Sequence, residues 1–116
     1  MQLSYKTPIW LYSEPVDFRK QIDGLVLLIA SELALEPTNG ELFLFRNRTA
    51  AAIKLLWYDG NGFWLCYKRL EKGRLRFPKN QAEVMQITQD QLSWLLSGLD
   101  ILAHQELPKT NAKKFF

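Results

Sequence analysis

The sequence is poor in the residues that build disulfides, metal sites and nucleophilic sites. Its 116 residues include a single cysteine, Cys66, and a single histidine, His104. One cysteine cannot close an internal disulfide, and these two residues fall short of the four ligands that a structural zinc site needs. We therefore expect no disulfide framework, no metal and no other cofactor.

Long hydrophobic runs are missing as well. The longest uninterrupted apolar stretch extends from Leu25 to Ala30, whereas a helix that crosses a bilayer needs roughly 20 such residues. Residues 1–10 contain no basic stretch followed by an apolar one, which a secretory signal would require. These absences predict a cytoplasmic protein that does not enter a membrane.

The residues that are present favour a folded chain. Hydrophobic residues make up 47% of the sequence, and there are four tryptophans, so one substantial core can form at this length. We expect a single α+β domain over residues 1–107. The remaining residues, 108–116, lack periodicity and contain Lys109, Lys113 and Lys114, which predicts a mobile basic tail.

Two segments have the hydrophobic spacing of amphipathic helices. Apolar residues at Phe18, Ile22, Leu25, Ile29 and Leu33 predict a long helix over Asp17 to Leu35, with Asp17 as a candidate N-cap. A second helix is expected from Gln89 to about Leu99, because Thr88 to Gln91 fits a capping box before a leucine-rich stretch.

The middle of the chain has the pattern of an antiparallel β-meander. The expected turns are Asp59–Gly62 and Lys72–Gly73. The expected strands are Glu41–Arg46, Ile53–Tyr58, Phe63–Leu70 and Arg74–Phe77, with Ile9–Tyr12 as a further short strand or extended lead-in. The predicted fold is α+β, with an antiparallel meander of about four to five strands packed against one long N-terminal helix and a short C-terminal helix.

The two turns also predict which side chains share a face of the sheet. The first turn pairs Tyr58 with Phe63, and the second pairs Leu70 with Leu75. One face, expected to lie under the long helix, then contains Ile53, Leu55, Trp57, Trp64, Cys66, Leu70, Leu75 and Phe77, with Lys68 as an exception. The other face is basic and aromatic and contains Lys54, Leu56, Tyr58, Phe63, Leu65, Tyr67, Arg69, Arg74 and Arg76.

Charge is distributed unevenly along the chain. Arg46 to Lys79 contains nine Lys or Arg and two acidic residues, a net charge of +7, while the rest of the chain carries −4. Such asymmetry is typical of a surface for phosphates or for an acidic partner. In the predicted register Arg69 faces Arg76, and an external anion would relieve their repulsion. The pattern fits equally well a solvated basic face whose aromatic residues pack under Glu41 to Arg46 or against a second subunit.

Candidates for catalysis are few. Cys66 is expected on the core face of a strand, where a thiol is usually inert. Asp17, Asp59 and Asp100 have the positions of a helix cap, a turn residue and a helix end. The least favoured hypothesis is a metal-dependent nuclease that uses Asp23 or Asp59. We predict no catalytic residue.

Several stretches occur in the order found in a known family, the TnpB accessory proteins of the insertion sequence 66 family, which the chain resembles. They are Asp17–Lys20 with Asp23–Leu25, Leu42–Arg48, Ile53–Gly60 with Gly62, Tyr67–Gly73, Phe77–Pro78, and Leu95–Leu96 with Gly98–Asp100. Gln21 and Ala50 to Ala52 depart from the family pattern. The resemblance implies a non-catalytic protein of a bacterial mobile element that assists a separate transposase of the same element.

The leading hypothesis is an accessory factor for transposition that contacts element DNA, or the transposase on DNA. Tyr58, Phe63 and Tyr67 are expected to stack on bases or to form an interface. The predicted nucleic-acid-binding residues are Arg19, Lys20, Arg46, Arg48, Lys54, Lys68, Arg69, Arg74 and Arg76. The alternative is a protein-interaction module that bridges or dimerises the transposase without touching DNA. A homo-oligomer is compatible with either hypothesis.

Overall fold

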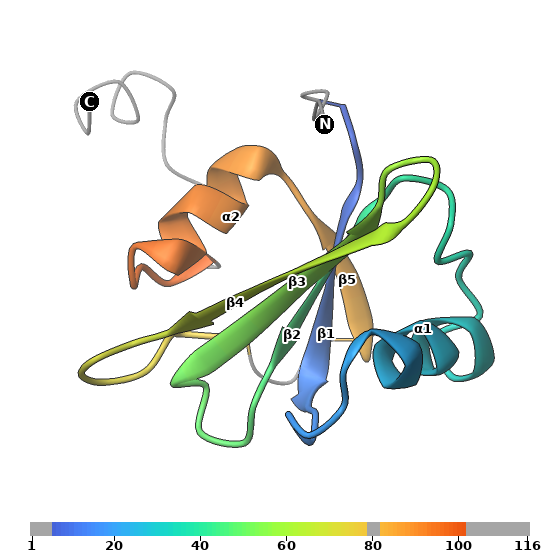
Figure 1. Cartoon of the computed structure of the whole chain (residues 1–116). Coiled ribbons are helices and arrows are strands. Elements are labelled where there is room, and N and C mark those ends of the chain that lie inside the picture. Colours follow the sequence, from blue (N-terminus) through green and yellow to red (C-terminus); the bar gives the residue numbers. More distant parts are fainter. Residues whose placement is uncertain (1–5, 79–81, 102–116) are drawn as a thin grey trace.

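The computed structural model describes residues 6–78 and 82–101, which form a mixed five-stranded sheet with one helix on each face (Figure 1). The strand order is β4-β3-β2-β1-β5, with β1 parallel to β2 and the other neighbours antiparallel. In chain order the elements are β1 (Ile9–Pro15), α1 (Ile22–Ser31), β2 (Leu42–Arg46), β3 (Ala52–Tyr58), β4 (Phe63–Arg69), β5 (Val84–Ile87) and α2 (Gln89–Leu96).

The predicted fold, an antiparallel meander on one long helix, is wrong in two respects. The segment predicted as a short strand or extended lead-in is β1, which lies inside the sheet and runs parallel to β2, so the sheet is mixed and not antiparallel throughout. A parallel neighbour requires the chain to cross over one face of the sheet, and α1 makes this crossover. The helix itself spans ten residues and does not extend over Asp17 to Leu35.

Both central strands are buried on both faces, which explains their sequences. In β2 the four residues from Leu42 to Phe45 are all at most 1% exposed. In β1, Ile9 and Leu11 are inaccessible and Tyr12 is 8% exposed. A strand covered on both sides has a continuous apolar run without clear alternation. The loose alternation of Glu41 to Arg46 is therefore the pattern of a central strand.

Local hydrogen bonds make α1 shorter than its apolar spacing suggests. Before the helix, the carboxylate of Asp17 accepts from the backbone N–H of Arg19 at 2.9 Å, which folds these residues into a turn. After it, Ala34 adopts a left-handed conformation at φ 54°. Phe18 and Leu33 lie outside the helix but pack against the same cluster as its buried residues. Because they pack against the same cluster, the helix-like spacing of apolar residues in the sequence continues beyond the ends of α1.

The sheet separates two hydrophobic clusters. The cluster on the α1 face is formed by Tyr12, Val16, Leu25, Leu28, Ile29, Phe43, Phe45 and Leu56. The cluster on the α2 face includes Ile9, Leu11, Leu42, Leu44, Ile53, Trp57, Leu75, Phe77, Ile87, Leu95 and Ile101. The view along the sheet shows the two helices on opposite sides of it (Figure 1). The face predicted to be basic and aromatic is thus largely a second core face, covered by α1.

The hairpin and the second helix are confirmed. Tyr58 pairs with Phe63 and Trp57 with Trp64, as the turn at Asp59–Gly62 predicts. In α2, the Thr88 hydroxyl accepts from the Gln91 backbone, and the Gln91 side chain accepts from the Thr88 backbone, completing the capping box. The predicted tail, 108–116, lies outside the described residues.

The fourth meander strand is not formed. Residues 74–77 belong to no strand, and the N–H of Leu75 donates to the carbonyl of Ala50 rather than pairing with Leu70. Arg69 lies opposite Ala52, so it does not face Arg76. The sheet is instead completed by β5, which pairs with β1. The sequence of residues 84–87 shows no clear strand pattern.

The packing of α1 gives a direct test of the fold. Ile29 is inaccessible in the α1 cluster, whereas its near neighbour Leu27 is 65% exposed. We expect Ile29→Ala to lower the free energy of unfolding by about 2–5 kcal/mol, because it removes buried methyl groups and leaves a cavity. Leu27→Ala should change it by less than about 0.5 kcal/mol. Urea denaturation followed by circular dichroism measures both, and equal effects would contradict this placement of α1.

Candidate functional site

Positively charged side chains line one open pocket of about 790 Å³. Four arginines contribute to its wall, two from the end of β2 and the following turn and two from the segment after β4. The full lining is Arg46, Arg48, Thr49, Ala50, Arg74, Leu75, Arg76, Phe77, Pro78 and Asp100. We call this the arginine pocket. Its cations come from segments about thirty residues apart in the sequence.

The turn between β2 and β3 forms one side of the arginine pocket and holds the other side in place. The Asn47 side chain accepts from the N–H of Ala52 at 3.2 Å and closes the turn. Ala50 has φ 59°, a left-handed conformation that is uncommon for a residue with a side chain. The carbonyls of Ala50 and Ala51 accept from Leu75 and Leu70, both at 2.8 Å. These bonds attach the segment after β4 to the turn.

Alternating burial directs two of the arginines outward. Leu75 and Phe77 are 3% and 9% exposed and pack in the α2 cluster. The residues between and beside them, Arg74 and Arg76, are consequently exposed. The same period of two misled the sequence prediction, because it is the pattern of a strand even though this segment has no strand partner.

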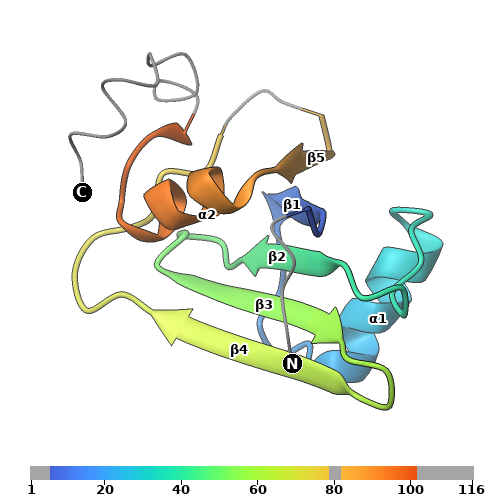
Figure 2. The same ribbon diagram turned by 90° about the horizontal axis from the view of Figure 1, so that it is seen from above.

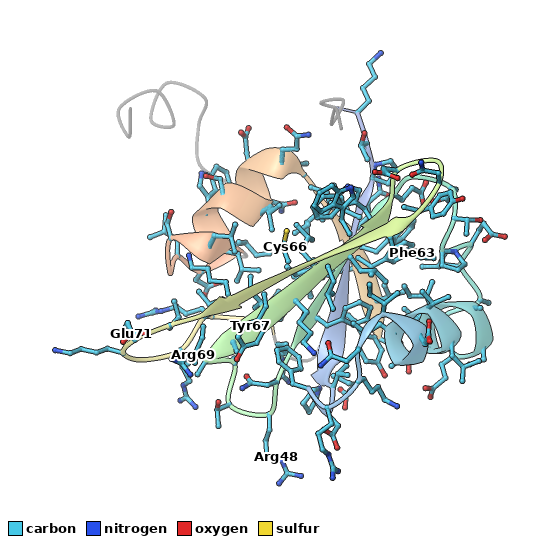
Figure 3. All side chains as sticks on the ribbon, in the orientation of Figure 1. Arg48, Phe63, Cys66, Tyr67, Arg69 and Glu71 are labelled. Atoms are coloured by element: carbon cyan, nitrogen blue, oxygen red, sulfur yellow. The ribbon has the colours of Figure 1, made fainter. Side chains whose placement is uncertain are left out.

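Arg46 has a different environment from the other three arginines. Its Nε donates to the carbonyl of Ser13 at 2.9 Å, and its guanidinium lies 5.7 Å from the centre of the Phe77 ring. It is half-buried, while Arg48 is exposed on the turn (Figure 3). Among the described residues, Arg48, Arg74 and Arg76 have no carboxylate within ion-pair distance. The pocket thus combines one anchored cation with three that are available to an anion.

Lys54 is the predicted binding residue that the structure removes from the surface. It is 4% exposed, and its ammonium donates to the carbonyls of Phe18 at 2.9 Å and Lys20 at 2.6 Å. The same ammonium lies 4.8 Å from the centre of the Phe18 ring. Burial lowers the pKa of Lys54. Lys54 therefore joins β3 to the turn before α1, and its ammonium is engaged by two backbone carbonyls.

The other predicted cations lie apart from the arginine pocket. Arg19 pairs with Asp17, with its Nε 3.0 Å from the Asp17 carboxylate, and this hydrogen bond helps to lower the pKa of Asp17 to about 2. Lys20 is exposed beside it. Lys68 donates to the carbonyl of Leu96 at 3.3 Å, where a cation complements the C-terminal end of α2. Arg69 is exposed at the end of β4.

The predicted stacking residues do not line the arginine pocket. The Tyr58 and Phe63 rings meet edge to face at 5.0 Å, and Phe63 packs against the α1 cluster. Tyr67 is 57% exposed and contacts Phe18 with its ring edge at 6.0 Å. Trp64, which was expected in the core, is 52% exposed and stacks on Trp57 at 6.1 Å. Among the residues that the structure describes, the exposed aromatic side chains are Trp64 and Tyr67, and both belong to β4.

The residues considered for catalysis are not gathered into one site in the described part of the chain. There, no three His, Cys, Asp or Glu residues form a group that could hold a metal ion. Cys66 shares a face with Trp57 and Trp64 as predicted, but α2 covers that face instead of the long N-terminal helix. Cys66 is also exposed rather than buried, because β4 is an outer strand (Figure 3). Asp59 accepts from the indole N–H of Trp64 at 2.7 Å, which lowers the pKa of Asp59. His104 lies outside the described residues.

Comparison with known proteins places the chain in a family. The profile of the IS66 Orf2-like proteins matches residues 7–106, which is most of the sequence. The chain belongs to this family. Membership gives it a transposition-associated accessory role in the context of an IS66-type insertion sequence and its transposase.

The chain is also similar to two proteins of Sinorhizobium fredii over most of its length. The uncharacterized protein y4hO is 38% identical over 98 residues, covering 84% of this chain and 85% of the relative. The uncharacterized protein y4jC is 35% identical over 92 residues, covering 79% of each chain. No solved structure matches significantly. In the described parts of this IS66 Orf2-like chain, no helix has the length and apolar character needed to cross a membrane.

The environment of Lys54 predicts a structural effect rather than a binding effect. Lys54→Met keeps the aliphatic stem but leaves the carbonyls of Phe18 and Lys20 without their donor. We expect the free energy of unfolding to fall by about 1–3 kcal/mol, as urea denaturation would show. Lys72→Met removes the same charge from an exposed loop residue and should have almost no effect on stability. Unchanged stability of Lys54→Met would contradict the structural role.

Proposed function

We propose that this IS66 Orf2-like protein assists transposition by contacting element DNA, alone or together with the transposase, through the arginine pocket. The observation that supports the proposal is the convergence of Arg46, Arg48, Arg74 and Arg76 on one open concave surface. Within residues 46–79, which carry a net charge of +7, these four arginines share one pocket. Lys54 and Lys68 instead donate hydrogen bonds to backbone carbonyls of the same chain.

Arginine suits this role for a physical reason. A guanidinium presents a planar set of donors that can bind a phosphate through two hydrogen bonds, and it stays charged at all relevant pH values. Hydrogen bonds fasten the irregular backbone of the pocket wall to a tight turn. The backbone of Arg48, Arg74 and Arg76 is therefore held in place, while their exposed guanidinium groups can adjust to a phosphate. Asp100 also lines the pocket and adds one negative charge to its wall, which disfavours anions on that side.

The contacts expected from this geometry are with the phosphate backbone. Such contacts supply affinity and position but carry no base sequence by themselves. Tyr58 and Phe63 pack against each other and do not line the pocket, so these contacts do not include base stacking by either residue. Lys20 and Arg69 remain exposed but lie outside the arginine pocket, so the proposal assigns them no phosphate contact.

A second candidate function has its own supporting observation. Trp64 and Tyr67 are both more than half exposed, and large exposed aromatic side chains are typical of protein interfaces. In this alternative, the protein bridges or dimerises the transposase without DNA contact. Copurification with the transposase that survives nuclease treatment would favour it.

The test of DNA contact is a salt series of fluorescence anisotropy with element-end DNA and scrambled DNA. The variant Arg74→Ala/Arg76→Ala removes two exposed arginines of the pocket. We expect weaker binding and a salt slope smaller by roughly two units, because each lost phosphate contact lowers it by about 0.9.

The matched control is Lys20→Ala/Lys72→Ala, which removes the same net charge from two exposed residues outside the arginine pocket. Its salt slope should stay within a fraction of a unit of the parent. Equal slopes for the two variants would mean that overall charge, not the pocket, binds DNA. If neither DNA binds at low salt, the proposal fails and the protein-interaction alternative takes its place.

A further inference from the structure

The outer edge of β4 carries a row of backbone groups that no described strand pairs. β4 is the first strand in the sheet order and has β3 as its single neighbour. Seen from above, both helices lie over the faces of the sheet and leave this edge uncovered (Figure 2). β4 contains seven residues, whereas β5 at the opposite edge contains four. The longer edge strand is therefore the better template for another strand.

The hydrogen-bond pattern shows which residues of β4 point their backbone outward. The backbone N–H of Asp59 donates to the carbonyl of Gly62 at 3.0 Å, and the N–H of Leu70 donates to the carbonyl of Ala51 at 2.8 Å. Both hydrogen bonds fit the continuous register between β3 and β4. In an antiparallel pair, bonded and non-bonded positions alternate. The backbone groups that form hydrogen bonds with β3 are therefore those of Trp64, Cys66 and Lys68. The outward N–H and C=O groups belong to Phe63, Leu65, Tyr67 and Arg69.

This edge lacks most of the devices that protect edge strands. Its register with β3 has no bulge, and its sequence, FWLCYKR, contains no proline. Its charged residues, Lys68 and Arg69, stand together at one end, while the aromatic residues Phe63 and Trp64 stand at the other. Trp64 and Tyr67 are largely exposed on opposite faces of the strand. An edge of this kind is either occupied or prone to association.

We propose that the occupant is the β4 strand of a second copy of this chain, paired antiparallel with Cys66 on the two-fold axis. In this register Leu65 faces the partner's Tyr67 and Phe63 faces the partner's Arg69. These positions have outward backbone groups on both strands, so each pair exchanges two hydrogen bonds. Trp64 faces the partner's Lys68, which places a cation beside an indole. The two sheets become one continuous sheet.

Self-complementarity of charge selects this arrangement. Antiparallel pairing centred on Cys66 places each cation opposite an aromatic residue, whereas parallel pairing in register would place Lys68 beside Lys68 and Arg69 beside Arg69. Like charges that face each other across strands are destabilising. Centring on Cys66 is also the antiparallel register in which all seven residues of β4 face residues of the partner strand. Shifting the centre to Leu65 or Tyr67 leaves strand ends unpaired.

The position of Cys66 makes the register measurable. Cys66 is exposed and would face its copy at a non-hydrogen-bonded position, where Cα atoms lie about 4.5 Å apart. That separation is within the range that a disulfide spans. The purified full chain, without DNA, should therefore run as a dimer of twice 13.6 kDa in light scattering and should form a crosslink through Cys66 under mild oxidation.

A cysteine scan decides between registers. In a Cys66→Ser background, Trp64→Cys mixed with Lys68→Cys should crosslink, while each variant alone should not. A monomer at every concentration, or crosslinks from Trp64→Cys alone, would overturn the proposal. These experiments are done without DNA, so a negative result would overturn the dimer proposal and leave the DNA-binding proposal untouched.

A proline variant tests the role of the backbone itself. The N–H of Tyr67 points away from β3, so Tyr67→Pro removes an edge donor while retaining the β3 pairing, and edge positions tolerate proline. We expect Tyr67→Pro to be a folded monomer by circular dichroism and light scattering. Tyr67→Ala keeps the N–H and should remain a dimer. A Tyr67→Pro dimer that still crosslinks through Cys66 would contradict pairing through this edge.

Discussion

Burial of β1 and β2 on both faces is the constraint on which the rest of the structure depends. Leu42 to Phe45 and the inaccessible residues of β1 present apolar side chains in both directions, so neither face of the sheet can be left to solvent. One face is covered by α1, the crossover that a parallel pair requires. The other is covered by α2 together with the segment after β4. The three-layer arrangement follows from this two-sided burial.

The arginine pocket is a consequence of the same requirement. Leu75 and Phe77, in the segment after β4, are buried in the α2 cluster. Arg74 and Arg76 alternate with them and therefore face outward. The hydrogen bonds of this segment to Ala50 and Ala51 bring it beside Arg46 and Arg48. A charged surface has thus been built on irregular backbone held by a rigid sheet, which is where binding residues commonly lie.

The positive charge of the middle segment was visible in the sequence, but its distribution over the surface was not. Lys54 belongs to that segment and was predicted on the basic and aromatic face of the sheet. It is instead buried under the turn before α1, where two backbone carbonyls accept hydrogen bonds from its ammonium. Cys66 shows the opposite error, because it was predicted to be buried and is exposed. It lies on the predicted face of the sheet, but that face is uncovered at the outer strand β4. Net charge and periodicity indicate a partner class, whereas exposure depends on which element lies above each residue.

The sequence by itself determined what local chemistry controls. The hairpin at Asp59–Gly62 follows from its turn residues, the start of α2 from a capping box, and the strands around the hairpin from the apolar and aromatic residues that flank the turn. Tertiary structure alone decided that β1 is central, that β5 forms an edge, that α1 ends at Ser31, and that Arg74 and Arg76 join Arg46 and Arg48. Turns and caps are made by hydrogen bonds between residues close in sequence. The choice of strand partner and of the covered face is set by burial between residues far apart, which no local pattern encodes.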